Sequence, residues 1–93
     1  MRYVLITSDE AFLDIENAVE YYNSQKKGLG KRFAITIKKA FADIRKMPMS
    51  ASFVFDDTRY KVVAKFPYNI LYRVQGNIIF IARVFNTHQR PIY

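Results

Sequence analysis

The stretch QKKGLGKRF, residues 25–33, separates two helical patterns and decides how the chain folds. Before it, apolar residues recur at steps of three and four, which predicts a helix over about residues 8–24 with one buried stripe, formed by Phe12, Ile15, Val19 and Tyr22. After it, a second apolar arc runs from Leu29 to Met47 and predicts a helix that Pro48 ends. One of the two glycines in the stretch should adopt the left-handed conformation. Because the link is so short, the two helices should form an antiparallel hairpin.

The segments on either side of the helices have the composition of strands. Residues 3–6 form a short opening strand, and residues 59–66, 69–74 and 78–85 form three more, with a weaker candidate at 51–55. Thr7 and Glu10 fit a capping box at the start of the first helix, and Gly76-Asn77 is typical of a two-residue hairpin turn. The order β-α-α-β-β-β indicates an α+β fold, in which the helical hairpin packs on one face of a twisted antiparallel sheet. Residues 1–93 should form a single domain.

Alternation along residues 59–66 predicts which side of the sheet is basic. Tyr60, Val62, Ala64 and Phe66 should face the core, so Arg59, Lys61 and Lys65 should point outward with Val63. We therefore expect the sheet face away from the helices to be basic and to meet either solvent or a partner.

The charge is distributed unevenly along the chain. The net charge is +7, but residues 1–25 contain five acids and one basic residue, whereas residues 26–93 contain fourteen basic residues and three acids. A basic body of this kind attracts polyanions, either a nucleic acid or an acidic protein partner. There is no glycine-rich phosphate loop or helix-turn-helix pattern, so we expect no sequence-specific DNA binding.

The composition also limits the possible chemistry and location. The chain has no cysteine and one histidine, so we expect neither a disulfide nor a metal site, and no motif indicates a cofactor. The N-terminus has no signal-peptide pattern and no apolar run is long enough to span a membrane, so a cytoplasmic protein is expected.

A set of weak motifs becomes specific when their order and spacing are considered together. They are Ala11, Asp14-Ile15, Ala18, Tyr21-Tyr22, Gly28-Leu29-Gly30, Phe33, Ile44, Pro48, Arg59, Phe66-Pro67-Tyr68, Ile70, Tyr72 and the run Val84-Phe85-Asn86-Thr87-His88. Over nearly the whole chain, this pattern resembles the ParE branch of the ParE/RelE toxin superfamily, whose members are also described as plasmid stabilisation proteins.

The resemblance implies a fold and a set of partners. The family fold is a helical hairpin on a twisted antiparallel sheet, and each toxin is encoded beside an antitoxin that wraps and silences it. ParE-like members poison DNA gyrase, whereas RelE-like members cleave mRNA on the ribosome. Since one fold serves both activities, the fold alone does not decide between them. We expect a gyrase-binding toxin without an active site; the alternatives are a metal-independent mRNA endonuclease and an inactive interaction module.

Endonuclease activity would need cations to stabilise the transition state and a group that moves a proton. Candidates for these roles are Arg59, Lys61, Arg73, Arg83, His88, Arg90 and Tyr93. RNA-cleaving members usually carry an arginine where this chain has Asn69, and a neutral amide does not stabilise developing charge in the same way. This departure favours a binding toxin, with a solvated His88. The candidate contacts for antitoxin or target are then Arg59, Lys61, Lys65, Arg73, Arg83, His88 and Arg90.

Arg73 and Arg83 lie inside otherwise apolar strands, so each should have a partner or face outward. With a two-residue turn at Gly76-Asn77, Arg73 should lie opposite Phe80 and Arg83 opposite Ile70. That register places the two arginines on different faces of the sheet unless a bulge intervenes.

Overall fold

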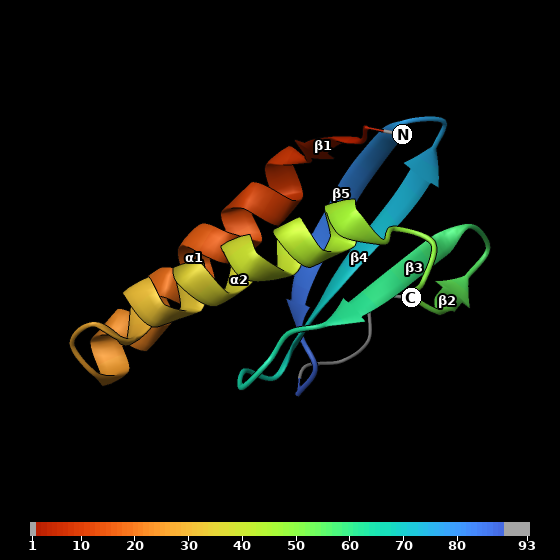
Figure 1. The fold of residues 1–93 in the computed structure, drawn as a ribbon. Coiled ribbons are helices and arrows are strands. Elements are labelled where there is room, and N and C mark those ends of the chain that lie inside the picture. The colour runs from red at the N-terminus through yellow and green to blue at the C-terminus, as the bar shows by residue number, and fades with distance from the viewer. Residues whose placement is uncertain (1, 89–93) are drawn as a thin grey trace.

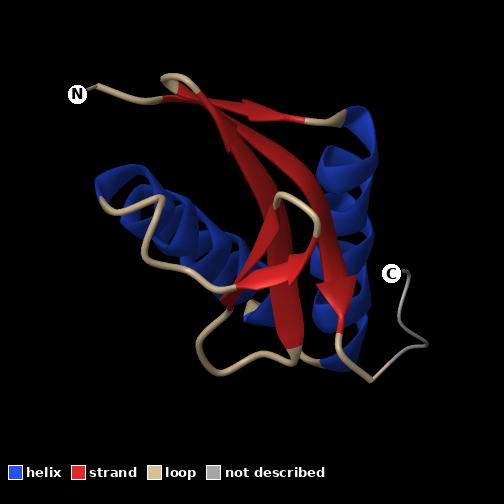
Figure 2. Cartoon of the chain, turned by 90° about the vertical axis from the view of Figure 1, so that its right-hand side faces the viewer, coloured by secondary structure: helices blue, strands red, loops and turns tan. Residues whose placement is uncertain are grey.

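The computed structural model describes residues 2–88 and contains two helices and five strands in that range. The elements are β1 (Val4–Thr7), α1 (Asp9–Gln25), α2 (Leu29–Lys46), β2 (Phe53–Phe55), β3 (Thr58–Val62), β4 (Tyr68–Gln75) and β5 (Ile78–Asn86). The expected α+β fold is confirmed: the two helices form a hairpin on one side of a single sheet (Figure 1). Figure 2 shows the helices spreading apart from the turn that joins them.

The sheet has the order β1-β5-β4-β3-β2 and is mixed, not wholly antiparallel. β2, β3, β4 and β5 form an antiparallel meander, but β1 runs parallel to β5, with Val4 opposite Ile78. A parallel pair requires a long connection between its strands, and here the helical hairpin and three strands of the meander separate β1 from β5 along the chain. The weak candidate at 51–55 does form a strand, β2, so the meander has one strand more than the predicted order.

The helices begin and meet at small polar residues and glycines. Ser8, not Thr7, caps α1: its Oγ accepts from the Ala11 N–H and donates to the Ala82 carbonyl of β5. Gly28 has a left-handed φ of 86° and precedes α2. A Cβ on Gly30 would overlap the Val19 carbonyl oxygen, so only glycine lets the two helices approach this closely.

The core lies between the helical hairpin and the central strands. α2 contributes its predicted arc, with Phe33, Ile37, Ala40 and Ile44 buried. These side chains meet the β4 and β5 residues Ile70, Tyr72, Ile79, Ile81 and Val84.

α1 packs through smaller residues than its sequence pattern predicts. Ala11 and Ala18 are buried, whereas Phe12 is 59% exposed, so its expected place in the core is wrong. Met47, which follows α2, is likewise 64% exposed. The expected members Ile15, Val19 and Tyr22 are half-buried against the core. Ala18 lines a small pocket with Tyr68, Val84 and Phe85, so this part of α1 lies against the sheet.

Candidate functional site

The sheet face away from the helices is predominantly apolar. Cross-strand partners share a face, and the register joins Leu71 to Tyr60, Asn69 to Val62, and Arg73 to Phe80. We call this surface the open face; its exposed side chains are Val4, Ile6, Phe55, Val62, Arg73 and Gln75. Leu71 and Phe85 on the same face are buried and lie outside the helix-facing core cluster. The prediction of a basic open face is therefore wrong.

The basic row of β3 points the other way. Arg59 pairs with Tyr72 and Lys61 with Ile70, so both side chains emerge on the helix side of the sheet. Val63 continues that side and is buried in the core. The predicted alternation of two faces along β3 is correct, but the two faces were assigned the wrong way round. Basic side chains can lie on the helix side here because β3 is near the margin of the helical layer. Arg59 and Lys61 there remain half-exposed even though they face the helices.

Lys65 lies beyond β3, in the turn that leads to β4. β3 ends at Val62, four residues before its predicted end, and Lys65 has a left-handed φ of 67°. Its side chain is exposed beside a groove of about 340 Å³ that Leu29, Arg32, Ile35, Thr36 and Phe66 also line.

Arg59 holds the segment between α2 and β2 in place. Its Nη1 donates to the Ala51 carbonyl at 2.6 Å and to the Met49 carbonyl at 3.0 Å, and its guanidinium lies 4.0 Å from the centre of the Phe53 ring. The Tyr72 hydroxyl donates to the Pro48 carbonyl in the same segment, and burial raises the pKa of Tyr72 while the charge of Arg59 opposes the rise. These contacts give Arg59 a structural role.

A bulge at Ala82 changes the predicted position of Arg83. Arg73 lies opposite Phe80 as predicted, but Tyr72 pairs with Ile81 and Leu71 with Arg83, so Ala82 is the extra residue. The prediction that Arg83 lies opposite Ile70 is wrong, and the backbone register places both arginines on the open-face side.

The Arg83 side chain is engaged at the edge of β5. Its Nε and Nη2 donate to the two carboxylate oxygens of Asp14 on α1, at 2.8 and 2.9 Å, and the pair is partly exposed. Hydrogen bonding to Asp14 raises the pKa of Arg83. Asp14 also accepts from the Val84 backbone N–H at 3.0 Å. Val84 lies in the part of β5 beyond the residues that pair with β1, so Asp14 supplies the acceptor there. An intramolecular partner for Arg83 had been one of the two open alternatives.

The remaining candidates lie at the C-terminal end of the chain. His88 is exposed just after β5, and its backbone N–H donates to the Asn86 side chain. Arg90 and Tyr93 lie outside the described residues. Within residues 2–88, the candidate cations thus occupy separate environments: Arg59 on the helix side, Arg73 on the open face and Arg83 at the β5 edge.

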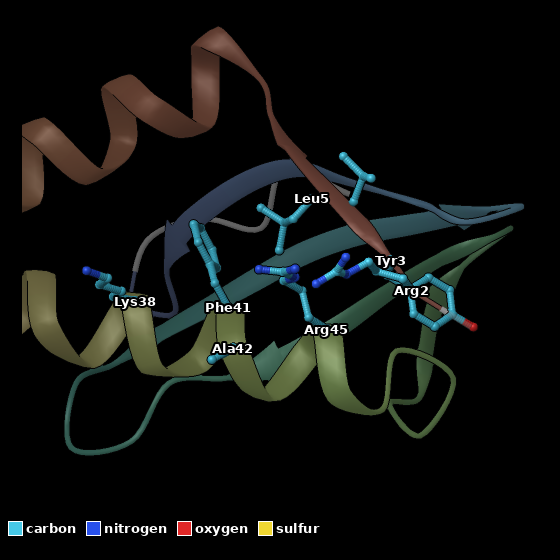
Figure 3. Close-up of a pocket in the computed structure, with 8 residues that line it drawn as sticks. Arg2, Tyr3, Leu5, Lys38, Phe41, Ala42 and Arg45 are labelled. Atoms are coloured by element: carbon cyan, nitrogen blue, oxygen red, sulfur yellow. The ribbon is translucent and has the colours of Figure 1, made fainter.

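A groove that the sequence did not predict lies between β1 and α2 (Figure 3). Its volume is about 500 Å³, and its lining residues are Arg2, Tyr3, Val4, Leu5, Lys38, Phe41, Ala42 and Arg45. Lys31, Lys38 and Arg45 recur every seven residues along α2, and this spacing alone indicates no more than a solvated helix face. The sequence signal that indicates this groove is Phe41, an aromatic residue that lies between Lys38 and Arg45 on α2.

Two further findings bear on the chemistry of the chain. In residues 2–88, no group of three histidine, aspartate or glutamate side chains is arranged to hold a metal ion. No described helix is long and apolar enough to cross a membrane.

Comparisons with known proteins give one family match and a fold shared with two solved structures. Residues 5–91 match the family described as the ParE toxin of the type II toxin–antitoxin system parDE. A solved structure of the chromosomal ParDE toxin–antitoxin system of P. aeruginosa superposes with a TM-score of 0.82 at 15% identity, covering 91% of this chain and 96% of that one. The toxin–antitoxin complex RelBE2 of Mycobacterium tuberculosis gives a TM-score of 0.66 at 17% identity, covering 92% and 99%. No protein with a curated description matches the sequence.

Proposed function

Because the chain belongs to the ParE toxin family of type II toxin–antitoxin systems, we propose that it is a toxin that binds and poisons DNA gyrase and that a cognate antitoxin neutralises it. The observation that carries the binding mechanism is the separation of Arg59, Arg73 and Arg83, the candidate arginines within residues 2–88. Cleavage of RNA without a metal needs several cations on one phosphate and a proton-transfer group beside it. Here Arg59 is bound to backbone carbonyls and Arg83 to Asp14, so neither guanidinium is free to take up that role.

A neutral residue on the open face, Asn69 near the start of β4, supports the same mechanism. Asn69, where RNA-cleaving relatives usually have an arginine, lies between Val62 and Phe85 on this face. A neutral amide flanked by apolar residues is suited to a protein contact and offers little to a pentacoordinate phosphate.

The open face is also the surface on which we propose that the antitoxin lies. Val4 and Ile6 at one edge and Phe55 and Val62 at the other are between 43% and 62% exposed, and such a collection of apolar side chains is typical of an interface. Arg73 provides one cation within it, which an acidic antitoxin residue can pair with. Lys61 and Lys65 remain candidate contacts for an acidic antitoxin segment that passes the end of β3.

The first experiment expresses the chain alone in a bacterial host and follows growth, the DNA damage response and mRNA integrity together. Gyrase poisoning predicts growth arrest with DNA damage and intact mRNA, and the purified chain should inhibit supercoiling by gyrase. Arrest with cleaved mRNA would favour the endonuclease instead. Soluble protein without any arrest would favour an inactive interaction module.

The antitoxin surface is tested with two matched variants. Val62→Asp places a charge on the open face, and Ile35→Asp places the same charge on α2; the parent side chains are 62% and 58% exposed. We expect Val62→Asp to weaken binding of the antitoxin by about tenfold or more, since a buried unpaired charge is costly in an interface. Ile35→Asp should leave the affinity nearly unchanged. Equal affinities for both variants would refute the open face as the antitoxin surface.

A further inference from the structure

The outer face of α2 carries two parallel rows of positive charge. The helix contains six basic residues and one acid, and the basic residues occur as three adjacent pairs spaced seven positions apart: Lys31-Arg32, Lys38-Lys39 and Arg45-Lys46. Seven residues make nearly two helical turns, so the first members of the pairs form one row and the second members another, with about 10 Å between successive charges. All six side chains are exposed.

The stability of the helix does not explain this pattern. A helix dipole favours acids in the first turn and cations in the last, which accounts for the final pair but not for Lys31 and Arg32, since the first turn of α2 has no acid. The one acid, Asp43, is a helical neighbour of Lys39 and Lys46 only. No ion pair joins any of the six cations to an acid within the described part of the chain. Rows of like charge repel each other, and a polyanion relieves the repulsion.

Neighbouring elements extend the positive charge at both ends of α2. Lys65, in the turn between β3 and β4, lines a groove with Arg32, and Arg2 lines another with Lys38 and Arg45. No acidic side chain lines either groove, and Figure 3 shows Arg2 and Arg45 extending toward one another. We call the six α2 cations together with Arg2 and Lys65 the basic face. It follows the whole length of α2, which is about 27 Å for 18 residues.

The composition of the basic face selects the kind of ligand. Between its rows only Ile35 and Ala42 are apolar, whereas a protein interface has an apolar core from which lysine is depleted. The other large apolar side chains of α2 are buried or half-buried in the domain, so the helix has no apolar face to insert into a membrane. Phe41 is among them, so α2 offers no exposed ring on which single-stranded bases can stack. Spaced cations with little apolar surface suit the phosphodiester backbone of a duplex.

We propose that the basic face binds the backbone of duplex DNA without reading its sequence. Lysine and arginine side chains on α2 contact phosphates, and no side chain enters a groove to read base edges. Duplex DNA is favoured over duplex RNA because gyrase acts on DNA, and in this choice the inference rests on the proposed function. α2 lies on the helix side of the sheet, so the open face stays available to a protein while the basic face holds DNA (Figure 1). The toxin would then engage its target where that target is bound to DNA.

The test measures the binding of a fluorescently labelled duplex of mixed sequence to the purified chain at several salt concentrations. If about four to six cations neutralise phosphates, the logarithm of the association constant should fall against the logarithm of salt with a slope of about −4 to −5. Arg45→Gln and Arg73→Gln are matched, since each removes one exposed guanidinium, the first from the basic face and the second from the open face. Arg45→Gln should bind about fivefold more weakly with a slope smaller by about one, and Arg73→Gln should stay within about twofold of wild type. Lys31→Gln/Lys38→Gln/Arg45→Gln removes one whole row and should lower the slope by about three, while glutamine preserves the helix.

The outcomes separate this inference from the proposed function, because the binding assay contains no gyrase. Equal weakening by Arg45→Gln and Arg73→Gln would show that binding follows net charge and not the basic face, and the inference would be wrong. Tighter binding of single-stranded DNA or of duplex RNA than of duplex DNA would assign the face to another polyanion and would also overturn it. A wild-type chain that does not bind the duplex even at low salt refutes the inference, whereas poisoning of gyrase through the open face would still stand. A chain that binds the duplex as expected but leaves gyrase active would support the basic face and contradict the proposed target.

Discussion

Replacing Arg59 with alanine tests whether this residue acts in folding or in chemistry. The substitution removes the hydrogen bonds to the Ala51 and Met49 carbonyls and the stacking on Phe53. The Met49 carbonyl belongs to an exposed residue and can bind water, so its loss costs little. The half-buried Ala51 carbonyl loses a charged partner worth about 1.5–3 kcal/mol, and the cation–π contact adds about 0.5–1 kcal/mol.

We therefore expect Arg59→Ala to lower the free energy of unfolding by about 2–4 kcal/mol. In a domain of this size each kcal/mol shifts Tm by about 4–8 °C, so the melting temperature should fall by roughly 8–32 °C. Arg59→Lys should recover less than half of the loss, because an ammonium group lacks the planar fork that reaches two carbonyls and stacks on a ring. The measurements are urea unfolding and thermal melting of the purified chain.

Lys61→Ala is the matched control, since Lys61 follows two residues later on the same side of β3 and its side chain has no hydrogen bond or ion pair within residues 2–88. It should change stability by less than about 0.5 kcal/mol. If Arg59→Ala melts with the wild type yet abolishes toxicity, the structural role assigned to Arg59 is incorrect and a functional role replaces it.

Three further predictions concern packing, the β5 edge and pH. Gly30→Ala should lose about 1–3 kcal/mol by overpacking against the Val19 carbonyl, which exceeds the gain of about 1 kcal/mol that alanine normally brings to a helix; a more stable variant in urea unfolding would contradict the close helix contact. Asp14→Ala leaves the buried Val84 N–H without its acceptor and should cost about 1–3 kcal/mol, with faster amide hydrogen exchange at Val84; unchanged exchange would count against the proposed edge contact. Because burial raises the pKa of Tyr72 above its usual 10.0, the folded chain holds this proton more tightly than the unfolded chain does. Stability should then fall as the pH rises above about 10, and Tyr72→Phe should reduce that slope in a pH series of thermal melts.

Local sequence signals determined the helices and the fold class well. The hairpin is predicted by local signals, namely the spacing of Phe33, Ile37, Ala40 and Ile44 and the glycines of residues 25–33. Each signal depends only on residues a few positions away, so the rest of the chain is not needed to interpret it. The Gly76-Asn77 turn similarly fixed the pairing of Arg73 with Phe80, because register near a tight turn follows from the turn itself.

Tertiary structure decided the direction in which the functional side chains point. The bulge at Ala82 moves Arg83 by one register position, and a bulge has no reliable sequence signal in a strand this apolar. Alternation along β3 separates two sets of side chains but does not say which set faces the helices. Only the packing of Val63 into the core reveals that Arg59 and Lys61 lie on the helix side. The parallel pairing of β1 also required the folded chain, since it joins residues more than seventy positions apart.

The sequence by itself thus determined the family, the α+β class and the excess of positive charge, because these depend on residue types and short spacings. Only the fold determined that the open face is apolar, that Arg59 and Arg83 are bound within the chain, and that Arg2 meets Lys38 and Arg45 in one groove. The physical reason is that a surface is formed by segments that are distant in the sequence. Which residues meet on it depends on how the side chains of the core pack.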